Sequence, residues 1–305
     1  MTLKAKPKNK SIVYVKFPKT GLGNMLLLWA KATVFARLNH LEVFTTSWFG
    51  FRWGALVRRE QKKRLYRKYF IETPVAKRML IGFYLKLNNV VIEPAVELVP
   101  QVSPLKNTVY VFNQVMTEPD LFRSIRNHSQ LVRDELNKSL HPTQKLSLKN
   151  FEGPVIGVHI RRGDFTLGSI ITPLSFFIEG IKIIRTALKE CLPVTVFTDA
   201  GIDEIAPIFE LPNVKLAEKK ADILDVVLLA KSKVLLLSAT STFSYFAGFL
   251  STGLIIMPAN DWLGSIRGTE NSALHEMKWD HTNEASTKDF IKQLSLLPQA
   301  QMYQQ

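Results

Sequence analysis

Short runs of apolar residues alternate with longer segments along the chain. Residues 11–17 are rich in β-branched and aromatic side chains, which predicts a buried strand. A turn with two glycines follows. Apolar residues then surround nearly the whole circumference of residues 24–38, so this segment is predicted to be a buried helix. Residues 41–45 predict a second strand, and the four segments together indicate the opening of an α/β domain.

The same alternation returns in the second half of the chain. From about residue 46 to 150 the pattern is weaker, with basic helical segments and a short strand at 107–112, and we expect the polar stretch 141–152 to be a linker. Beyond it the pattern predicts four strands, at 155–160, 194–198, 234–237 and 254–257. It also predicts three helices between them, at 174–188, 221–231 and 242–250. This order predicts a mostly parallel sheet with both faces covered.

Length and composition favour two domains. The chain has 305 residues, of which 46% are apolar, and it has one cysteine, Cys191. A single core stops growing near about 250–300 residues, so we expect a basic domain at 1–150 and a second domain at 151–305, with a ligand cleft between them. The composition excludes a disordered, collagen-like or disulfide-stapled chain.

Charge is divided unequally between the two halves. Residues 1–150 hold 26 Lys and Arg against 9 Asp and Glu, a net +17, whereas residues 151–305 hold 14 against 17. The densest basic block, residues 52–68, is interleaved with aromatic side chains. It is either a solvated helix face or a surface for an anionic membrane, a lipid diphosphate or a nucleic acid. No nucleic-acid-binding motif is present, so a membrane surface is the favoured partner.

Targeting signals are missing from the sequence pattern. No apolar run reaches the ~20 residues of a membrane-spanning helix, and the basic start of the chain lacks the apolar core of a signal peptide. We therefore expect a cytoplasmic protein, either free in solution or peripheral on the inner face of a membrane.

The first candidate site is the glycine loop after the first strand. Gly21 and Gly23 would let backbone amides approach an anion at a helix start. The loop is not a dinucleotide fingerprint, because Leu26 stands at the third glycine position. A tight turn with Asn24 as the helix N-cap explains it equally well.

The second candidate site ends the strand at 155–160. His159 and Arg161 are predicted to face one side and Arg162 the other, with Asp164 close behind. Adjacent guanidinium groups at a strand end are unfavourable without an anion. Either carboxylates neutralise them or they bind a diphosphate, which matches the bidentate geometry of arginine and is the favoured reading.

The third candidate site is the hydroxyl-rich segment 238–244. Its side chains either cap the following helix or offer hydroxyl and amide groups to phosphate oxygens. Upstream, Asp222 and Asp225 share a helical face, where a carboxylate could accept hydrogen bonds from guanine or stay solvated. No metal-binding or hydrolase motif is present, so a metal-free mechanism with no cofactor is predicted for an enzyme.

Taken in order, these motifs resemble the α-1,2-fucosyltransferase family over about residues 12–262. The family's Gly-Gly-x-Gly-Asn-Gln loop, His-x-Arg-Arg-Gly-Asp-Tyr strand end, Phe-Ser/Thr-Asp segment, Asp-rich helix and Asn-Ser-Ser/Thr-Phe-Ser segment correspond here to Gly21, Gly23, Asn24, His159, Arg161, Arg162, Asp164, Asp199, Asp225, Ser241, Thr242 and Phe243. Thr240 stands where the family has Asn.

The resemblance implies a GT-B fold with two Rossmann-like domains. It implies an inverting, metal-independent transfer of fucose from GDP-fucose to a glycan hydroxyl in surface polysaccharide (O-antigen or capsule) synthesis. The two arginines would hold the diphosphate, Ser241, Thr242 and the Phe243 amide would complete its cradle, and Asp225 would read guanine. His159 and Asp164 are candidates for a general base or for orienting the arginines. The basic domain would face a lipid-diphosphate-linked acceptor.

Two alternatives belong to other classes. Residues 14–21 also resemble the strand-loop of sulfotransferases that use a 5′-phosphosulfate donor (PAPS), with Arg161 and Ser169 spaced like that family's 3′-phosphate pair. A non-catalytic basic module that binds membranes or nucleic acid is the third reading. Stabilisation by GDP or by adenosine 3′,5′-bisphosphate would separate the first two.

Overall fold

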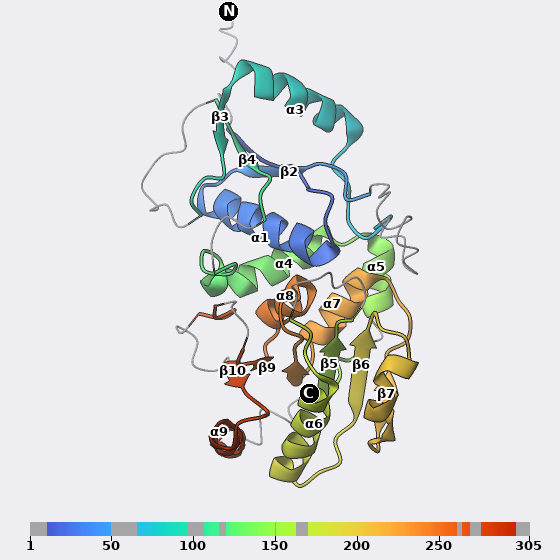
Figure 1. Cartoon of the computed structure of the whole chain (residues 1–305). Helices are drawn as coiled ribbons and strands as arrows, with labels where there is room; N and C mark the ends of the chain where they lie inside the picture. The colour runs from blue at the N-terminus through green and yellow to red at the C-terminus, as the bar shows by residue number, and fades with distance from the viewer. Residues whose placement is uncertain are drawn as a thin grey trace, which may run out of the picture. The chain divides into compact units, whose positions relative to one another are not determined.

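The computed structural model describes residues 11–49, 66–96, 107–115, 120–149, 151–162, 170–260, 264–268 and 276–296 (Figure 1). The chain divides into two compact units, Met1–Thr143 and Gln144–Gln305. Asp164, Ser169 and most of the aromatic-basic block lie outside the described residues.

The first unit is built on a four-stranded sheet in which every pair of neighbouring strands is parallel. Its strands are β1 (Ile12–Val15), β2 (Glu42–Thr45), β3 (Asn89–Ile92) and β4 (Thr108–Phe112), in the order β2-β1-β4-β3. The predicted strand–loop–helix–strand opening is confirmed.

Helices cover the two faces of this sheet unequally (Figure 1). The helices among the unit's described residues include α1 (Leu22–Leu38), α3 (Val75–Leu87), the short η1 (Arg126–His128) and α4 (Ser129–Ser139). Phe35 of α1 packs on Tyr110 and Phe112 of β4, whereas Ile81 of α3 packs with Val109 and Val111. Because neighbouring residues of a strand point to opposite faces, α1 and α3 lie on opposite sides of the sheet.

The second unit holds a six-stranded sheet that is also wholly parallel. The strands are β5 (Ile156–Ile160), β6 (Val194–Thr198), β7 (Val214–Leu216), β8 (Val234–Leu236), β9 (Leu254–Pro258) and β10 (Glu276–Trp279), in the order β10-β9-β8-β5-β6-β7. Along the chain, β5, β6 and β7 are added toward one edge of the sheet. The chain then returns to the other side of β5, and β8, β9 and β10 are added toward the opposite edge. The order is that of a doubly wound Rossmann sheet, with its switch point between β5 and β8.

Helices lie on both faces of this sheet. They are α5 (Pro142–Leu148), α6 (Leu174–Leu188), the 3₁₀ segment η2 (Asp203–Glu210), α7 (Asp222–Ala230), α8 (Thr242–Leu250) and α9 (Glu284–Leu296). Helix α6 packs with α9, and α7 packs with α8. Ile156, Val158 and Ile160 of β5 enter the core cluster with α6, whereas His159 faces α8.

The fold class predicted from the sequence, α/β with parallel sheets in two Rossmann-like units, is confirmed. The boundary between the two units, after Thr143, falls within the polar stretch 141–152 that was predicted to be a linker, and α5 occupies most of that stretch. Pro142 begins that helix, where its fixed φ suits the first helical position. Within the described part of the chain, no helix has the length and apolar character needed to cross a bilayer.

Candidate functional site

The carboxyl ends of β5 and β8 lie side by side at the switch point of the second unit's sheet. These strands pair directly, with Ile156, Gly157 and Val158 opposite Val234, Leu235 and Leu236. Crevices at such a point are where open α/β sheets bind ligands, because the connections on either side diverge there. Arg161 and Arg162 follow β5, and residues 238–241 follow β8, so two of the predicted sites meet at this edge.

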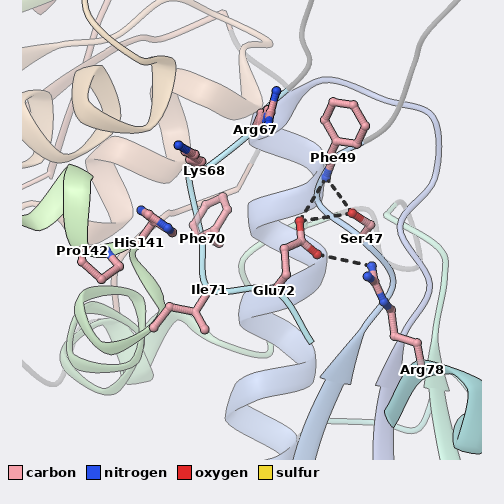
Figure 2. A pocket seen from close by; sticks show the side chains of 10 residues that line it. All are labelled: Ser47, Phe49, Arg67, Lys68, Phe70, Ile71, Glu72, Arg78, His141 and Pro142. Carbon is pink, nitrogen blue, oxygen red and sulfur yellow. Dashed lines mark hydrogen bonds and ion pairs between the residues drawn. The ribbon is translucent and has the colours of Figure 1, made fainter. Parts of the chain in front are cut away.

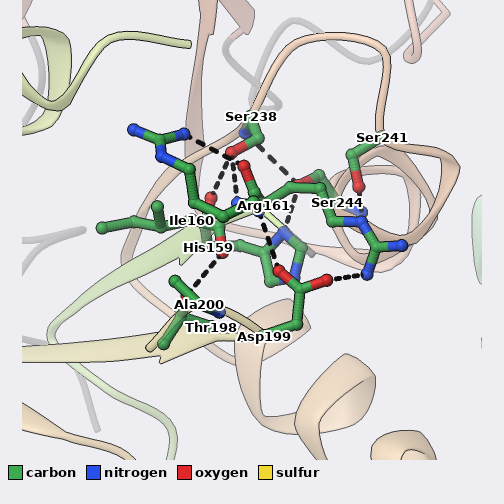
Figure 3. A network of polar contacts seen from close by, with 10 residues as sticks. His159, Ile160, Arg161, Thr198, Asp199, Ala200, Ser238, Ser241 and Ser244 are labelled. Atoms are coloured by element: carbon green, nitrogen blue, oxygen red, sulfur yellow. Dashed lines mark hydrogen bonds and ion pairs between the residues drawn. The ribbon is translucent and has the colours of Figure 1, made fainter. Parts of the chain in front are cut away.

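Asp199 organises the two arginines. Its carboxylate forms an ion pair with the guanidinium of Arg161 and accepts a hydrogen bond of 2.9 Å from the backbone N–H of Arg162 (Figure 3). Asp199 follows β6, whose Thr198 hydroxyl donates to the carbonyl of Ile160 (2.8 Å) and so joins the two strand ends. A carboxylate therefore neutralises one guanidinium, as one of the two readings of this strand end anticipated.

The guanidinium of Arg162 is held differently. Its Nη1 donates to the carbonyl oxygen of Arg161 at 3.0 Å, and the side chain is half-buried. Burial lowers the pKa of Arg162 from its ordinary value, and the nearby carboxylates of Glu204 and Asp199 act in the opposite direction. Among the described residues no carboxylate lies within ion-pair distance of Arg162, so its charge can serve an anion.

A buried hydroxyl network ties the arginine strand to α8 (Figure 3). Ser238 Oγ donates to the carbonyl of His159 (2.8 Å) and accepts from the backbone N–H of Arg161 (3.0 Å). Ser244 Oγ lies 2.5 Å from His159 Nδ1 and accepts from the N–H of Ser238 at 3.3 Å. The His159 ring also stacks on Phe243, with centroids 4.9 Å apart. His159 therefore has a positioning role in this network, which engages one of its ring nitrogens.

The start of α8 contributes a capped helix N-terminus. Ser241 is the N-cap, and its hydroxyl accepts from the N–H of Ser244 at 3.3 Å. Thr242 and Phe243 form the first turn, whose backbone N–H groups have no partner within the helix and carry a partial positive charge. Ser241, Thr242 and Phe243 are thus brought to the same sheet edge as the arginines, and both predicted uses of the segment, capping and anion binding, are compatible.

The turn that carries this helix start is strained. Thr240 has φ 53°, a left-handed conformation that is unfavourable for a β-branched residue. The neighbouring Ala239 N–H donates to Thr172 Oγ1 at 2.7 Å, and Thr172 is buried. These partners hold the turn in place.

Arg267 completes the other end of α8 and was not predicted. It is buried, and its guanidinium donates to the carbonyl oxygens of Gly253 (2.7 Å), Ser251 (2.9 Å) and Gly248 (3.3 Å). A cation at a helix C-terminus satisfies carbonyls and complements the helix dipole. No local signal distinguishes this arginine, since its partners depend on tertiary packing.

Two further predicted residues belong to α7. Asp225 and Asp222 are in the first turn of α7, which begins at the same sheet edge because all six strands are parallel. Among the described residues, no three His, Cys, Asp or Glu side chains gather in a group that could hold a metal ion.

Gly21, Gly23 and Asn24 belong to the first unit. The interpretation of Asn24 as N-cap is wrong, since α1 begins at Leu22 and Gly21 precedes it in an extended conformation. The Gly21 carbonyl accepts the first helical hydrogen bond, from Met25 N at 3.2 Å. The loop follows β1, one of the two central strands of the first sheet.

A pocket of about 640 Å³ opens within the first unit (Figure 2). Its apolar wall includes Phe70 and Ile71, and Arg67, Lys68 and His141 lie along one side. The described residues that line it are Ser47, Phe49, Arg67, Lys68, Phe70, Ile71, Glu72, Arg78, His141 and Pro142.

Glu72 fixes one wall of this pocket. Its Oε1 accepts from Ser47 Oγ (3.1 Å) and from the N–H groups of Trp48 (3.1 Å) and Phe49 (3.3 Å). Its Oε2 lies 3.4 Å from Arg78 Nη1. Behind that wall, buried Trp48 stacks on Phe70 with ring centroids 3.9 Å apart. The described lining of the pocket therefore contains both cationic and aromatic side chains.

No protein-family model and no curated protein matches the sequence, whereas solved structures do. POFUT1 in complex with GDP has a TM-score of 0.50 at 11% identity, over 83% of this chain and 99% of that chain. NodZ α-1,6-fucosyltransferase soaked with GDP-fucose has a TM-score of 0.47 at 14% identity, over 84% of this chain and 98% of that chain. The E. coli heptosyltransferase WaaC with ADP has a TM-score of 0.46 at 13% identity, over 93% of this chain and 100% of that chain. The likeness to POFUT1 establishes a fold similar to that of GT-B glycosyltransferases.

Proposed function

We propose that the chain is a glycosyltransferase that binds a GDP-sugar through the switch-point site of its second unit. The observation that carries this proposal is the meeting of Arg161, Arg162 and the N-terminus of α8 at one sheet edge. The guanidinium of Arg162, the backbone amides at the start of α8 and the neighbouring hydroxyls match a diphosphate in charge and in hydrogen bonding.

The same groups suit the chemistry of sugar transfer. As the bond between the sugar and the diphosphate breaks, the leaving GDP gains negative charge. Preorganised donors are worth most where charge develops in the transition state. Arg162 supplies this charge, whereas Arg161 and Asp199 hold the strand end in position. A metal ion is not needed for that role, and we expect turnover to survive chelation by EDTA.

The identity of the donor rests on the sequence resemblance. Fucose from GDP-fucose, with guanine read by Asp225, is the specific proposal, and inversion at the sugar carbon and a role in surface polysaccharide synthesis go with it. POFUT1, which shares the fold, was crystallised in complex with GDP.

The acceptor is assigned to the first unit. The pocket lined by Arg67, Lys68, His141 and Phe70 offers cations for a phosphate or carboxylate and apolar surface for a sugar face. A glycan linked to a lipid diphosphate carries both features. Replacing Lys68 by Ala should raise the KM for such an acceptor and leave hydrolysis of the donor alone unchanged.

Donor turnover and binding test the proposal directly. We expect hydrolysis and transfer with GDP-fucose in a screen that also contains GDP-mannose and UDP-sugars, and thermal stabilisation by GDP. Arg162→Ala should lower kcat/KM by about 10²–10³-fold, the range typical of losing one preorganised transition-state donor. Lys182→Ala removes an equal charge from the exposed surface of α6 and should leave turnover unchanged.

Two outcomes would reject this function. Stabilisation by adenosine 3′,5′-bisphosphate and not by GDP would favour the sulfotransferase reading. Full GDP-sugar turnover in the Arg161→Ala, Arg162→Ala double variant would remove the switch-point site from the reaction.

A further inference from the structure

Helix α3 presents a wide apolar face to solvent. Met79, Phe83 and Leu87 are 68%, 63% and 81% exposed, and Val75, Leu80 and Tyr84 are exposed beside them. At 100° per residue these six side chains span about half of the helix circumference. Inward-facing Ile81 is the buried residue of α3, and Leu85 packs partly beside it. An apolar helix face is normally covered by other parts of the protein, whereas this apolar arc of α3 is exposed.

The apolar face continues onto the edge of the sheet. Val90 and Ile92 of β3 pair in register with Val109 and Val111, the residues on which α3 packs. Paired residues of a parallel sheet point to the same face, so Val90 and Ile92 face the α3 side. They are 43% and 59% exposed. We call this surface, consisting of Val75, Met79, Leu80, Phe83, Tyr84, Leu87, Val90 and Ile92, the α3 face.

The charged residues of helix α3 have one sign. Helix α3 contains Lys77, Arg78 and Lys86 and no acidic residue. By helical position Lys86 lies between Val75 and Met79, within the apolar arc, where its long stem can lie along apolar surface with the ammonium at the rim. The first 150 residues carry a net +17. Contiguous apolar surface with cations among it is the pattern of an element that lies in the interface of an anionic bilayer.

We propose that the α3 face docks the protein onto an anionic lipid bilayer, with Phe83 and Leu87 inserted at the headgroup boundary. A second copy of the chain is a poorer occupant, since pairing two such faces would bring two strongly cationic halves together. The sequence pointed to the aromatic-basic block as the membrane surface, whereas the described residues point to α3. This inference does not depend on the proposed GDP-sugar chemistry.

Vesicle flotation of the full chain tests the docking surface. The wild type should float with phosphatidylcholine vesicles that contain phosphatidylglycerol, more weakly with phosphatidylcholine alone, and less as salt rises. The Phe83→Ser, Leu87→Ser double variant should lose roughly 100-fold in apparent affinity, about tenfold for each side chain. Lys86→Glu should lose roughly tenfold for the anionic vesicles and little for the neutral ones.

Matched controls separate insertion from general hydrophobicity and from misfolding. Leu146 of α5 and Ile291 of α9 are also exposed apolar helical residues, and the Leu146→Ser, Ile291→Ser double variant should bind vesicles like the wild type. The α3 variants should keep the wild-type melting temperature, because the replaced side chains are exposed. They should also keep the wild-type affinity for GDP, whatever that affinity is.

Three results would overturn the proposal. The wild type could fail to float with either vesicle, or the Phe83→Ser, Leu87→Ser variant could float as well as the wild type. Light scattering could instead reveal a dimer that this double variant converts to a monomer, which would make a second copy the occupant of the α3 face.

Discussion

Glu276 shows how one half-buried carboxylate both builds and weakens the second unit. One oxygen accepts from the backbone N–H groups of Ile266 and Arg267, each at 3.0 Å. These bonds fix the segment that carries the Arg267 guanidinium to the end of α8. Burial raises the pKa of Glu276 above its ordinary 4.5, although the hydrogen bonds from Arg267 and Ile266 and the charge of Arg267 act against the shift.

The raised pKa of Glu276 gives stability a definite pH dependence. The folded protein binds this proton more tightly than the unfolded chain does. The free energy of unfolding therefore falls as pH rises from about 4.5 through the raised pKa. Glu276→Gln keeps the acceptor oxygen and removes the titration, so the variant should lose this part of the fall and be the more stable protein near neutral pH.

Urea denaturation at a series of pH values measures this effect. Glu284→Gln on the exposed start of α9 is the control, because an exposed glutamate near Lys288 gains little from folding. If Glu276→Gln keeps the wild-type pH profile, the desolvation of Glu276 does not control stability in this range.

At the scale of elements, the turn between β8 and α8 connects strain to the site. Thr240 holds a left-handed backbone at φ 53° immediately before the Ser241 cap. Asn tolerates this conformation better than a β-branched residue does. Thr240→Asn should therefore raise the free energy of unfolding by about 1 kcal/mol while GDP binding is kept.

Chemical denaturation and GDP titration of Thr240→Asn check this together. Thr240→Val is the matched control, because it keeps the β-branched shape, and it should show no gain. A Thr240→Asn variant that is less stable than the wild type would mean that contacts of the threonine side chain outweigh the backbone strain.

Central elements could be predicted from the sequence because their signal is local. Strands β8 and β9 are continuous apolar runs and β5 and β6 are mostly apolar, as expected of strands covered on both faces, and α6 and α8 match the predicted ranges. The edge strands β7 and β10 are short and half polar, so they do not stand out from a loop. Helix α3 was not resolved as an element, because its apolar residues lack the polar face that makes a surface helix recognisable.

The residues of the candidate site could be predicted from the sequence, but the contacts between them could not. Arg161 and Arg162 stand out because charges directly follow an apolar run. Asp199, which accepts from Arg162, lies 37 residues further along the chain. Ser238, which accepts from Arg161, lies 77 residues further along. Such pairs follow from the order β8-β5-β6, which the pattern of single strands does not contain.

At the scale of the whole molecule, the chemistry is divided between two units with separate cores. The second unit holds the arginines and the start of α8, and the first holds the cationic pocket and the α3 face. The first unit also has a helix start directly after its central strand β1, where the Gly21 loop precedes α1. Each unit thus offers a distinct response to ligand.

Hydrogen exchange with GDP should reveal which groups of each unit hold the donor. Exchange should slow at the N–H groups of Thr242 and Phe243, which have no partner within α8 and would gain one from a phosphate oxygen. If the Gly21 loop also contacts the donor, as the sequence resemblance implies, the amides of residues 21–24 should be protected too.

The pocket gives this measurement an internal control. Its wall at Ser47 and Phe49 is already held by Glu72, so GDP alone should leave exchange there unchanged, and an acceptor should slow it. Protection confined to Thr242 and Phe243 would restrict the donor site to the second unit and leave the Gly21 loop as a helix start. Protection of the pocket by GDP alone would contradict its assignment to the acceptor, since a diphosphate would then be the ligand of its Arg67 and Lys68 side.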